Sequence, residues 1–178
     1  QPSVVINCTS LSKNKLQLND PLELIPIYAL LPHAIAKFCD RFSARFIQIS
    51  SDGVFSGDKG NYSEKDLPDA CDLYGKTKLL GEVSSNDCIT IRTSMIGHDR
   101  TQQNGLVSWF LNQEGACKGF SKSIFSGFPV TVLARIIRDY VLKNDKLYGI
   151  YNLASKPISK FDLLQLISEI YATNVNVV

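Results

Sequence analysis

The 178-residue sequence lacks several features that mark particular classes of protein. No charge dominates, since 19 Lys and Arg residues and 17 Asp and Glu residues leave a formal net charge of +2. A nucleic-acid partner or a membrane-surface partner is therefore not indicated. No apolar run approaches the roughly 20 residues that span a bilayer, and no charged leader precedes a short apolar segment. These absences predict a soluble protein.

Cysteine and histidine are too few and too scattered to indicate a disulfide framework or a metal site. The five cysteines include no Cys-x-x-Cys pair, which favours reduced thiols and a cytoplasmic setting. His33 and His98 have no partners at metal-ligand spacing, so a zinc site is not expected.

Four short runs of mostly apolar, β-branched residues indicate buried strands. The runs are nearly continuous in apolar residues rather than alternating, which is typical of a parallel sheet covered on both faces. Helical stretches separate them, and this order predicts a doubly wound α/β domain. The strands are expected at Val4 to Cys8, Arg45 to Ser51, Cys88 to Thr93 and Gly149 to Ala154.

The helices between these strands differ in how clearly the sequence marks them. The stretch 21–42 contains Pro26 and Pro32, so a kink or a late start near Pro32 is expected there. Ser159 is a plausible N-cap for the last helix. Further helices are predicted at 73–83, 131–142 and 159–171, and the polar stretch 97–105 is the best loop or small-domain junction.

Tyr74 and Lys78 are four residues apart in a predicted helix, so both side chains can face one cleft. A neighbouring ammonium favours the phenolate form of a tyrosine, which makes proton transfer to or from a carbonyl oxygen feasible. Ser50 and Ser51 follow a predicted strand upstream. In an open α/β sheet, ligands lie at the carboxyl ends of the strands, so these serines are well placed to contact a substrate oxygen.

Three segments in order resemble the extended short-chain dehydrogenase/reductase superfamily, and its dTDP-4-dehydrorhamnose reductase branch most of all. They are ISSDGVFSG at 49–57, KGNYSEKDLPDACDLYGKTKLLGE at 59–82 and ITIRTSMIG at 89–97. The resemblance implies a Rossmann-like, NAD(P)-binding fold with a small C-terminal substrate-binding portion. It also implies that residues 1–178 form a single partial domain, in which about 97–130 and 155–178 contribute to the substrate-binding portion.

The resemblance also implies residue roles. Tyr74 would protonate the substrate carbonyl oxygen, Ser51 would hydrogen-bond the same oxygen, and Lys78 would lower the pKa of Tyr74 and bind the nicotinamide ribose. The implied cofactor-binding residues are Asn7, Cys8, Ser50, Lys78, Arg92, Thr93 and Ser94. The implied substrate-binding residues are Ser51, Asp52, Met95 and Lys118.

The chain departs from the family pattern in several places. The family's glycine-rich dinucleotide turn is absent from these 178 residues, so truncation of the first sixty or so residues is expected, with NADP or NAD bound largely by the missing part. Tyr28, in YALLP, occupies the place of a common family asparagine. Gly53 replaces a tyrosine, and Met95 stands where the branch often has an aromatic residue.

Other conspicuous residues carry weaker functional interpretations. Lys118 and Lys122 are possible diphosphate contacts, although solvated lysines on a loop are the better interpretation. Trp109, Phe110 and Phe120 are interpreted first as core residues rather than as a sugar or nucleotide pocket.

Three functions are compatible with these residues. The first is an NAD(P)H-dependent reductase of a nucleotide-activated 4-keto-6-deoxysugar, as the resemblance implies. The second is a nucleotide-sugar epimerase or dehydratase, which is less favoured because SSD supplies only Asp52 near the tyrosine motif. The third is a catalytically silent binding or regulatory subunit. The expected small-molecule partner is a nucleotide sugar, and assembly as a homodimer is left open.

Overall fold

The computed structural model describes residues 1–11, 20–98 and 105–178, which form two compact units. Unit 1 comprises Gln1–Thr93 and Arg138–Leu153, and unit 2 comprises Ser94–Ile137 and Ala154–Val178. The tyrosine and lysine of the predicted catalytic pair and the serines that follow the second strand are all in unit 1. Most of the predicted junction at 97–105 lies outside the described residues.

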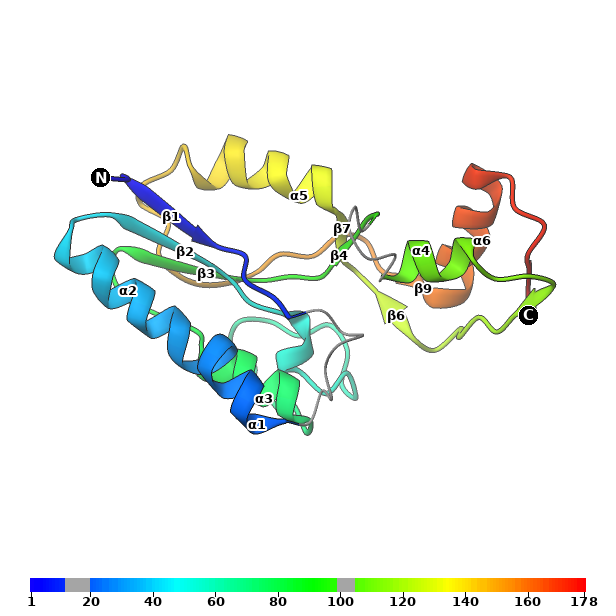
Figure 1. Ribbon diagram of the computed structural model, residues 1–178, viewed down its shortest axis with the longest axis horizontal. Helices are drawn as coiled ribbons and strands as arrows, with labels where there is room; N and C mark the ends of the chain where they lie inside the picture. The colour runs from blue at the N-terminus through cyan, green and yellow to red at the C-terminus, as the bar shows by residue number, and fades with distance from the viewer. Residues whose placement is uncertain (12–19, 99–104) are drawn as a thin grey trace. The chain divides into compact units, whose positions relative to one another are not determined.

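Unit 1 is built on a four-stranded sheet, which confirms the predicted α/β class. The strands are β1 (Val4–Asn7), β2 (Arg45–Ile49), β3 (Cys88–Arg92) and β8 (Gly149–Asn152). They lie in the order β1-β2-β3-β8, and each neighbouring pair is parallel (Figure 1). All four predicted strands are therefore present, each one or two residues shorter than expected.

The two inner strands are more deeply buried than the two edge strands. Every residue of β3 is buried, whereas Ile6 in β1 is 40% exposed. An edge strand has a neighbour on one side only, so its apolar side chains are covered less completely. The expectation of uniformly buried strands is therefore correct only for β2 and β3.

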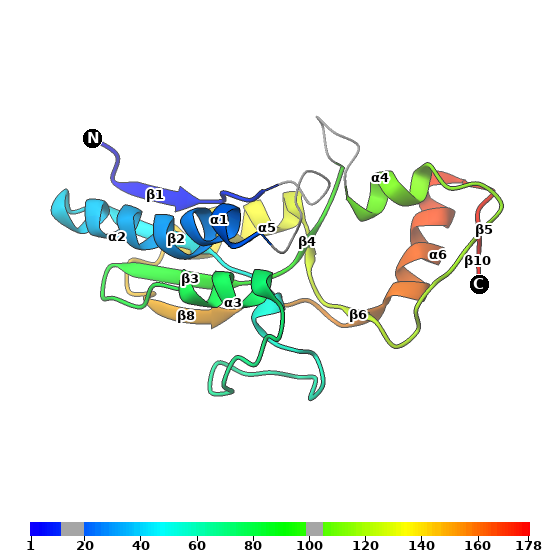
Figure 2. The ribbon, with the colours of Figure 1, turned by 60° about the horizontal axis from the view of Figure 1, so that its bottom comes forward.

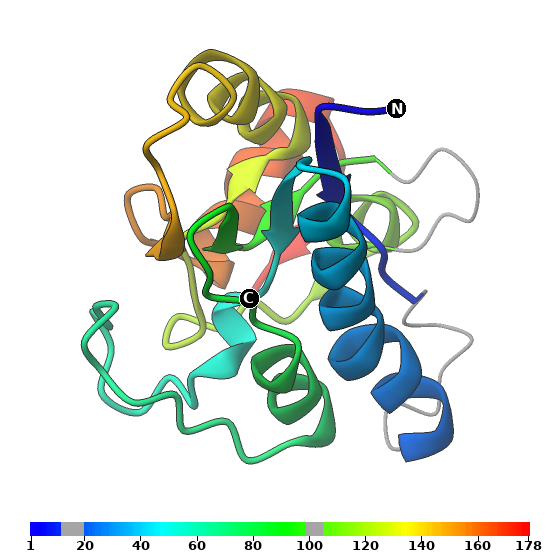
Figure 3. The same cartoon turned by 90° about the vertical axis from the view of Figure 1, so that its left-hand side faces the viewer.

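One continuous helical segment connects β1 to β2. It consists of α1 (Pro21–Leu24), a π-helical turn η1 (Ile25–Leu30) and α2 (Leu31–Arg41). The Asp20 carboxylate caps its start by accepting a hydrogen bond from the Leu22 N–H at 2.9 Å. Figure 3, which looks along the sheet, shows α2 and the helix α3 (Leu73–Leu80) covering the same face.

Of the two alternatives expected for this helix, the late start near Pro32 is wrong, because the helix begins at Pro21, and the kink stays a prediction. The π-helical turn accommodates the prolines, each of which lacks a backbone N–H. Within it the Leu31 N–H donates to the carbonyl of Pro26, five residues earlier, so the regular four-residue ladder is interrupted where proline would disrupt it.

The 21 residues Pro21–Arg41 are long and apolar enough to cross a membrane by length and composition alone. The expectation that no such stretch exists is therefore corrected. A core helix of a soluble protein and a signal sequence near the N-terminus meet the same criterion. Here the segment packs in unit 1 through Leu24, Tyr28, Ala29 and Cys39, all of which are at most 5% exposed.

Unit 2 has a separate core between two helices and short strand pairs. Helix α4 (Leu106–Leu111) contacts α6 (Lys160–Tyr171), and Ser159 caps α6 as predicted by accepting from the Asp162 N–H (Figure 2). The strand pairs are β4 (Met95–Ile96) with β7 (Phe128–Pro129), β6 (Ile124–Phe125) with β9 (Ile158–Ser159), and β5 (Ala116–Cys117) with β10 (Asn176–Val177). The buried core residues are Val107, Phe110, Cys117, Leu163, Leu164, Ile167, Val175 and Val177.

One further helical stretch runs through the boundary between the two units. Helix α5 (Val130–Ile136) is followed by the π-helical turn η3 (Ile137–Val141), in place of the single helix predicted at 131–142.

The end of η3 and the turn after it are held by β2. In unit 1 the Arg45 guanidinium donates to the carbonyl oxygens of Val141 and Leu147, at 2.7 and 3.1 Å.

Candidate functional site

The end of β2 directs two successive serines to different partners. The Ser50 hydroxyl donates to Glu82 Oε1 at 2.8 Å. The Ser51 hydroxyl accepts from the Gly53 N–H at 3.0 Å and donates to Asp52 Oδ1 at 3.3 Å. Because consecutive side chains of an extended chain point in opposite directions, only one of the two serines faces the turn that follows β2.

Helix α3 packs closely on this turn because it carries glycine after the tyrosine. A Cβ atom on Gly75 would lie 2.2 Å from the carbonyl oxygen of Gly53. Asp72 caps the helix, its carboxylate accepting from the Gly75 N–H at 2.7 Å. A larger residue at position 75 would push the helix away from the turn and separate the Tyr74 side chain from Ser51.

The Tyr74 phenol and the Ser51 hydroxyl meet above Gly53. A Cβ atom on Gly53 would be 3.2 Å from Ser51 Oγ and 3.4 Å from Tyr74 Cε1, so both groups line the same small space. The neighbouring Ser51 hydroxyl acts to lower the pKa of Tyr74, but burial is the larger effect, and the pKa of Tyr74 is raised above 10.0. The phenol is therefore held in its protonated form at neutral pH.

Lys78 lies one helical turn beyond Tyr74 and is only 6% exposed. Its ammonium donates to the Ile49 carbonyl oxygen at 2.9 Å. Burial lowers the pKa of Lys78 to about 8, although the nearby Glu82 and Cys8 favour the charged form. The net shift of the pKa of Tyr74 is upward, with burial as its largest cause, and the expected lowering of that pKa by Lys78 stays a prediction.

Tyr28, from the π-helical turn η1, contacts both members of the pair. Its ring packs edge-on against the Tyr74 ring, with the centroids 5.5 Å apart, and the Lys78 ammonium lies 5.1 Å from its centroid. Helix α3 approaches η1 closely, since a Cβ atom on Gly81 would be 1.8 Å from the Tyr28 carbonyl oxygen. Sequence reasoning noted Tyr28 only as a departure from the family and did not place it beside Tyr74 and Lys78.

A buried ion pair lies next to this group. The Arg92 guanidinium donates to both carboxylate oxygens of Glu82, at 2.8 and 2.7 Å, and the side chains are 5% and 3% exposed. Ser50 donates to the same carboxylate. The guanidinium carbon also lies 5.0 Å from the centroid of the Phe55 ring. Ser50 and Arg92 are thus held by Glu82, a residue that the sequence analysis did not single out, and their contact with a cofactor stays a prediction.

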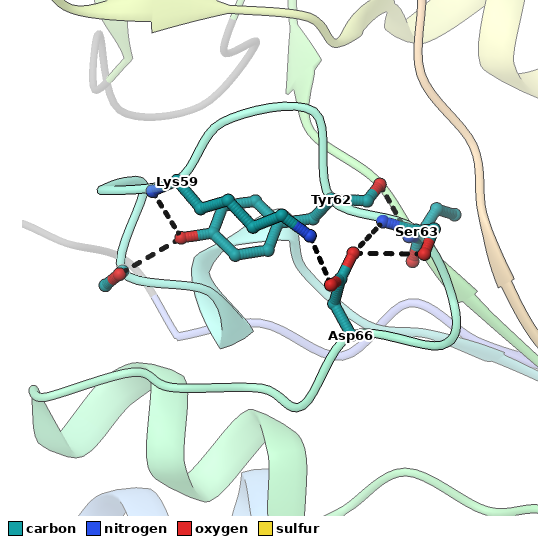
Figure 4. Close-up of polar contacts among 6 residues, drawn as sticks. Lys59, Tyr62, Ser63 and Asp66 are labelled. Atoms are coloured by element: carbon teal, nitrogen blue, oxygen red, sulfur yellow. Dashed lines mark hydrogen bonds and ion pairs between the residues drawn. The ribbon is translucent and has the colours of Figure 1, made fainter.

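The loop between β2 and α3 is fixed by its own polar contacts (Figure 4). Asp66 accepts from the Lys59 ammonium, from the Ser63 N–H at 2.8 Å and from the Ser63 hydroxyl at 3.0 Å. The Tyr62 hydroxyl accepts from the Lys59 N–H at 3.1 Å, and its ring stacks on Phe55 with centroids 4.3 Å apart. The Asp66 contacts lower the pKa of that carboxyl group to about 2.

The loop is also anchored to the end of β8. The Asn152 N–H donates to Glu64 Oε1 at 2.8 Å, and the Asn152 side-chain amide donates to the Tyr62 carbonyl oxygen at 3.2 Å. The loop therefore connects the carboxyl ends of β2 and β8.

The remaining predicted cofactor residues lie at the carboxyl ends of β1 and β3. Asn7 is buried and donates to Gln48 Oε1 at 2.8 Å, whereas Cys8 is exposed. The Thr93 carbonyl accepts from the Asp52 N–H at 3.4 Å, and Asp52 itself is exposed. In unit 2 the Ser94 carbonyl accepts from the Phe128 N–H at 3.0 Å.

The predicted residues of unit 2 are mostly on its surface. Met95 is 46% exposed, and Lys118 and Lys122 are exposed. Phe110 is fully buried, as the core interpretation requires. For Trp109 and Phe120 that interpretation is wrong: they are 42% and 52% exposed, because their rings pack around the Lys160 ammonium rather than in the core, at 5.4 and 5.1 Å.

The model of the RmlD substrate binding domain family matches residues 1–177. Subunit beta of methionine adenosyltransferase 2 from Bos taurus is 37% identical over 82 residues, which are 46% of this chain and 25% of that protein. A dTDP-4-dehydrorhamnose reductase from Mycolicibacterium smegmatis is 31% identical over 99 residues, which are 52% of this chain and 30% of that protein.

Solved structures resemble nearly the whole chain. A hypothetical dTDP-4-dehydrorhamnose reductase from Sulfolobus tokodaii has a TM-score of 0.85 at 27% identity, covering 99% of this chain and 65% of that one. Two more distant structures share the fold: a Bacillus anthracis reductase in complex with NADP, with a TM-score of 0.84 at 24% identity, and MoeE5 in complex with UDP-glucuronic acid and NAD, with 0.79 at 18%. Each match covers 99% of this chain. It covers 66% of the Bacillus anthracis reductase chain and 65% of the MoeE5 chain. The chain thus spans about two thirds of these proteins and a smaller share of the curated relatives.

Proposed function

Because the chain belongs to the RmlD substrate binding domain family, we propose that it is part of an NAD(P)H-dependent reductase of a nucleotide-activated 4-keto-6-deoxysugar. The single observation that carries the proposal is the meeting of the Ser51 hydroxyl and the Tyr74 phenol above Gly53, at the carboxyl end of β2. Ser51 and Tyr74 line the same space and each carries a hydroxyl group, so both can hydrogen-bond a carbonyl oxygen placed there.

The proposed chemistry is a reduction in which these two side chains act on the substrate oxygen. Ser51 donates a hydrogen bond to the carbonyl oxygen and orients it. As negative charge develops on that oxygen, Tyr74 transfers its proton to it, and the product is an alcohol. Since burial raises the pKa of Tyr74, the phenol is fully protonated before the reaction and is available as the general acid.

A nicotinamide cofactor, when bound, supplies the hydride. The residues present fit such a cofactor in part. Lys78 uses one of its three N–H donors on Ile49, which leaves donors for a ribose hydroxyl. The buried Nη1 atom of Arg92 has no hydrogen-bond partner among the described residues. Structural relatives are known in complex with NADP or NAD, and one with UDP-glucuronic acid, which supports the cofactor and the substrate class.

The test is turnover by the full-length protein. It should oxidise NADPH or NADH in the presence of a dTDP-4-keto-6-deoxysugar, and Tyr74→Phe should lower kcat by about 10²- to 10⁴-fold through loss of the general acid. Tyr148→Phe is the matched control, because Tyr148 is 58% exposed and in the same unit. Equal turnover by the Tyr74 variant and the wild type would remove the proposed catalytic role.

A second candidate function is a catalytically silent subunit of another enzyme. The observation that favours it is the similarity to subunit beta of methionine adenosyltransferase 2 over 82 residues. On this alternative, the wild-type protein binds a dinucleotide or a nucleotide sugar but does not turn over, and it co-purifies with a catalytic partner. Measurable NAD(P)H oxidation that depends on Tyr74 would exclude it.

A further inference from the structure

Tyr28 is the one aromatic residue that contacts both members of the proposed Tyr74 and Lys78 pair among the described residues. Tyr28 is 3% exposed. The Lys78 ammonium lies 5.1 Å from its centroid, within the distance of about 6 Å over which a ring attracts a cation. The Tyr74 ring meets it edge-on at 5.5 Å. One side chain therefore limits the positions of both others.

The hydroxyl group of Tyr28 makes a third connection. It accepts a hydrogen bond from the Leu11 N–H at 2.8 Å and lies 3.3 Å from the Ser10 hydroxyl. Ser10 and Leu11 belong to the segment that follows β1. Tyr28 thus connects the carboxyl end of β1 with helix α3.

We propose that Tyr28 is a positioning residue for the Tyr74 and Lys78 pair, with its ring holding the Lys78 ammonium against the Ile49 carbonyl oxygen. This inference rests on the proposed function of the pair and adds a residue to it.

The charge on Lys78 depends on the groups that surround it. Glu82, at the end of the same helix, and Cys8, after β1, favour the ammonium, while burial opposes it and lowers the pKa of Lys78 to about 8. The π face of Tyr28 also favours the ammonium. Lowering the electron density of the ring at position 28, without changing the size of the ring, should therefore lower the pKa of Lys78 further.

The test is a series of fluorinated phenylalanines at position 28, which reduce the electron density of the ring at nearly constant volume. NMR titration of the lysine Cε and Nζ resonances gives the pKa of Lys78, assigned with the Lys78→Gln variant. The expected result is a stepwise fall that totals about one pKa unit for the pentafluorinated ring. An unchanged or rising pKa across the series would overturn the proposal.

The same series at position 62 is the matched control. Tyr62 also lies under an ammonium, that of Lys59 at 5.8 Å, but it is in the loop after β2. Fluorination there should leave the pKa of Lys78 unchanged. A purely structural role of Tyr28 would lower stability without the stepwise change in pKa, so the titration separates the two roles.

Tyr28→Phe tests the hydroxyl group alone. It keeps the ring, so the pKa of Lys78 should be unchanged, while exchange of the Leu11 amide hydrogen should become about fivefold faster through loss of one hydrogen bond. Unaltered exchange would contradict the connection to the β1 segment. None of these measurements requires turnover. The titration can therefore contradict the positioning role of Tyr28 while the reductase proposal stands, and a failed turnover test can contradict the reductase proposal while the positioning role stands.

Discussion

Two polar groups lie side by side at the carboxyl end of the sheet in unit 1, and they differ in how completely their charges are paired. In the first, the Glu82 carboxylate accepts both hydrogen bonds of the Arg92 fork and one from Ser50. In the second, the Lys78 ammonium contacts a neutral carbonyl and an aromatic face, and Tyr74 lies beside the Ser51 hydroxyl and the Tyr28 ring. No carboxylate forms an ion pair with Lys78 among the described residues.

This difference separates structural polar residues from candidate reactive ones. The Glu82 carboxylate already has three donors and fixes the neighbouring strands and helix, so within this group only the Nη1 atom of Arg92 is left for another ligand. A buried amine with an incompletely satisfied charge has a lowered pKa and spare donors, which are the properties expected of a functional group. Both groups contain a serine from the same Ser50-Ser51 pair, so motif membership alone does not distinguish them.

Breaking the first group should have the largest effect on stability. Glu82→Leu leaves the Arg92 guanidinium buried and unpaired, and the free energy of unfolding should fall by about 3–5 kcal/mol. Urea denaturation at pH 7 measures it. Lys143→Ala, which breaks an exposed pair with Asp139 at 3.8 Å, is the control and should not shift the midpoint measurably.

The double variant Glu82→Leu, Arg92→Met sharpens this result. Because both charges are removed together, it should recover most of the lost stability. If the double variant is as unstable as Glu82→Leu alone, the single-variant loss arises from packing rather than from the unpaired charge.

Lys78 should affect stability in the opposite direction and in a pH-dependent way. Its pKa is about 8 in the folded protein, against 10.5 for an unperturbed lysine, so between these values the unfolded chain binds more protons and stability rises with pH. The cost of burying the charge is fully present below pH 8. Lys78→Met lacks this titration, so its stability relative to the wild type should decrease by about 2 to 3 kcal/mol between pH 7 and pH 10.

Urea midpoints of both proteins at several pH values measure this difference. The other titrating groups are common to the two proteins, so only the difference between them is interpreted. Parallel pH profiles would show that Lys78 has an ordinary pKa, and the contrast between the two polar groups would then disappear.

The sequence was informative where structure depends on local pattern. The four strands follow from continuous apolar runs, and the Tyr74 and Lys78 pair from helical spacing and motif order. The partners of these residues were not predictable in the same way. Glu82 and Tyr28 reach the site only because Gly75 and Gly81 let helix α3 approach the turn after β2 and the π-helical turn. Such close approaches depend on tertiary packing, and a single sequence carries only the glycines as a signal.

The smallest expected effect is the difference between two adjacent substitutions. Ser50→Ala removes a hydrogen bond to a buried carboxylate, so it should lower the free energy of unfolding by about 2 kcal/mol. Ser51→Ala removes the cap of the short helix η2 (Asp52–Val54) and should cost about 1 kcal/mol or less. In turnover the order should reverse, because Ser51 faces the Tyr74 phenol and Ser50 does not. Urea denaturation measures the two losses of stability, and kcat of each variant measures the two losses of turnover. A larger loss of kcat in the Ser50 variant than in the Ser51 variant would assign the functional role to the group of Ser50, Glu82 and Arg92.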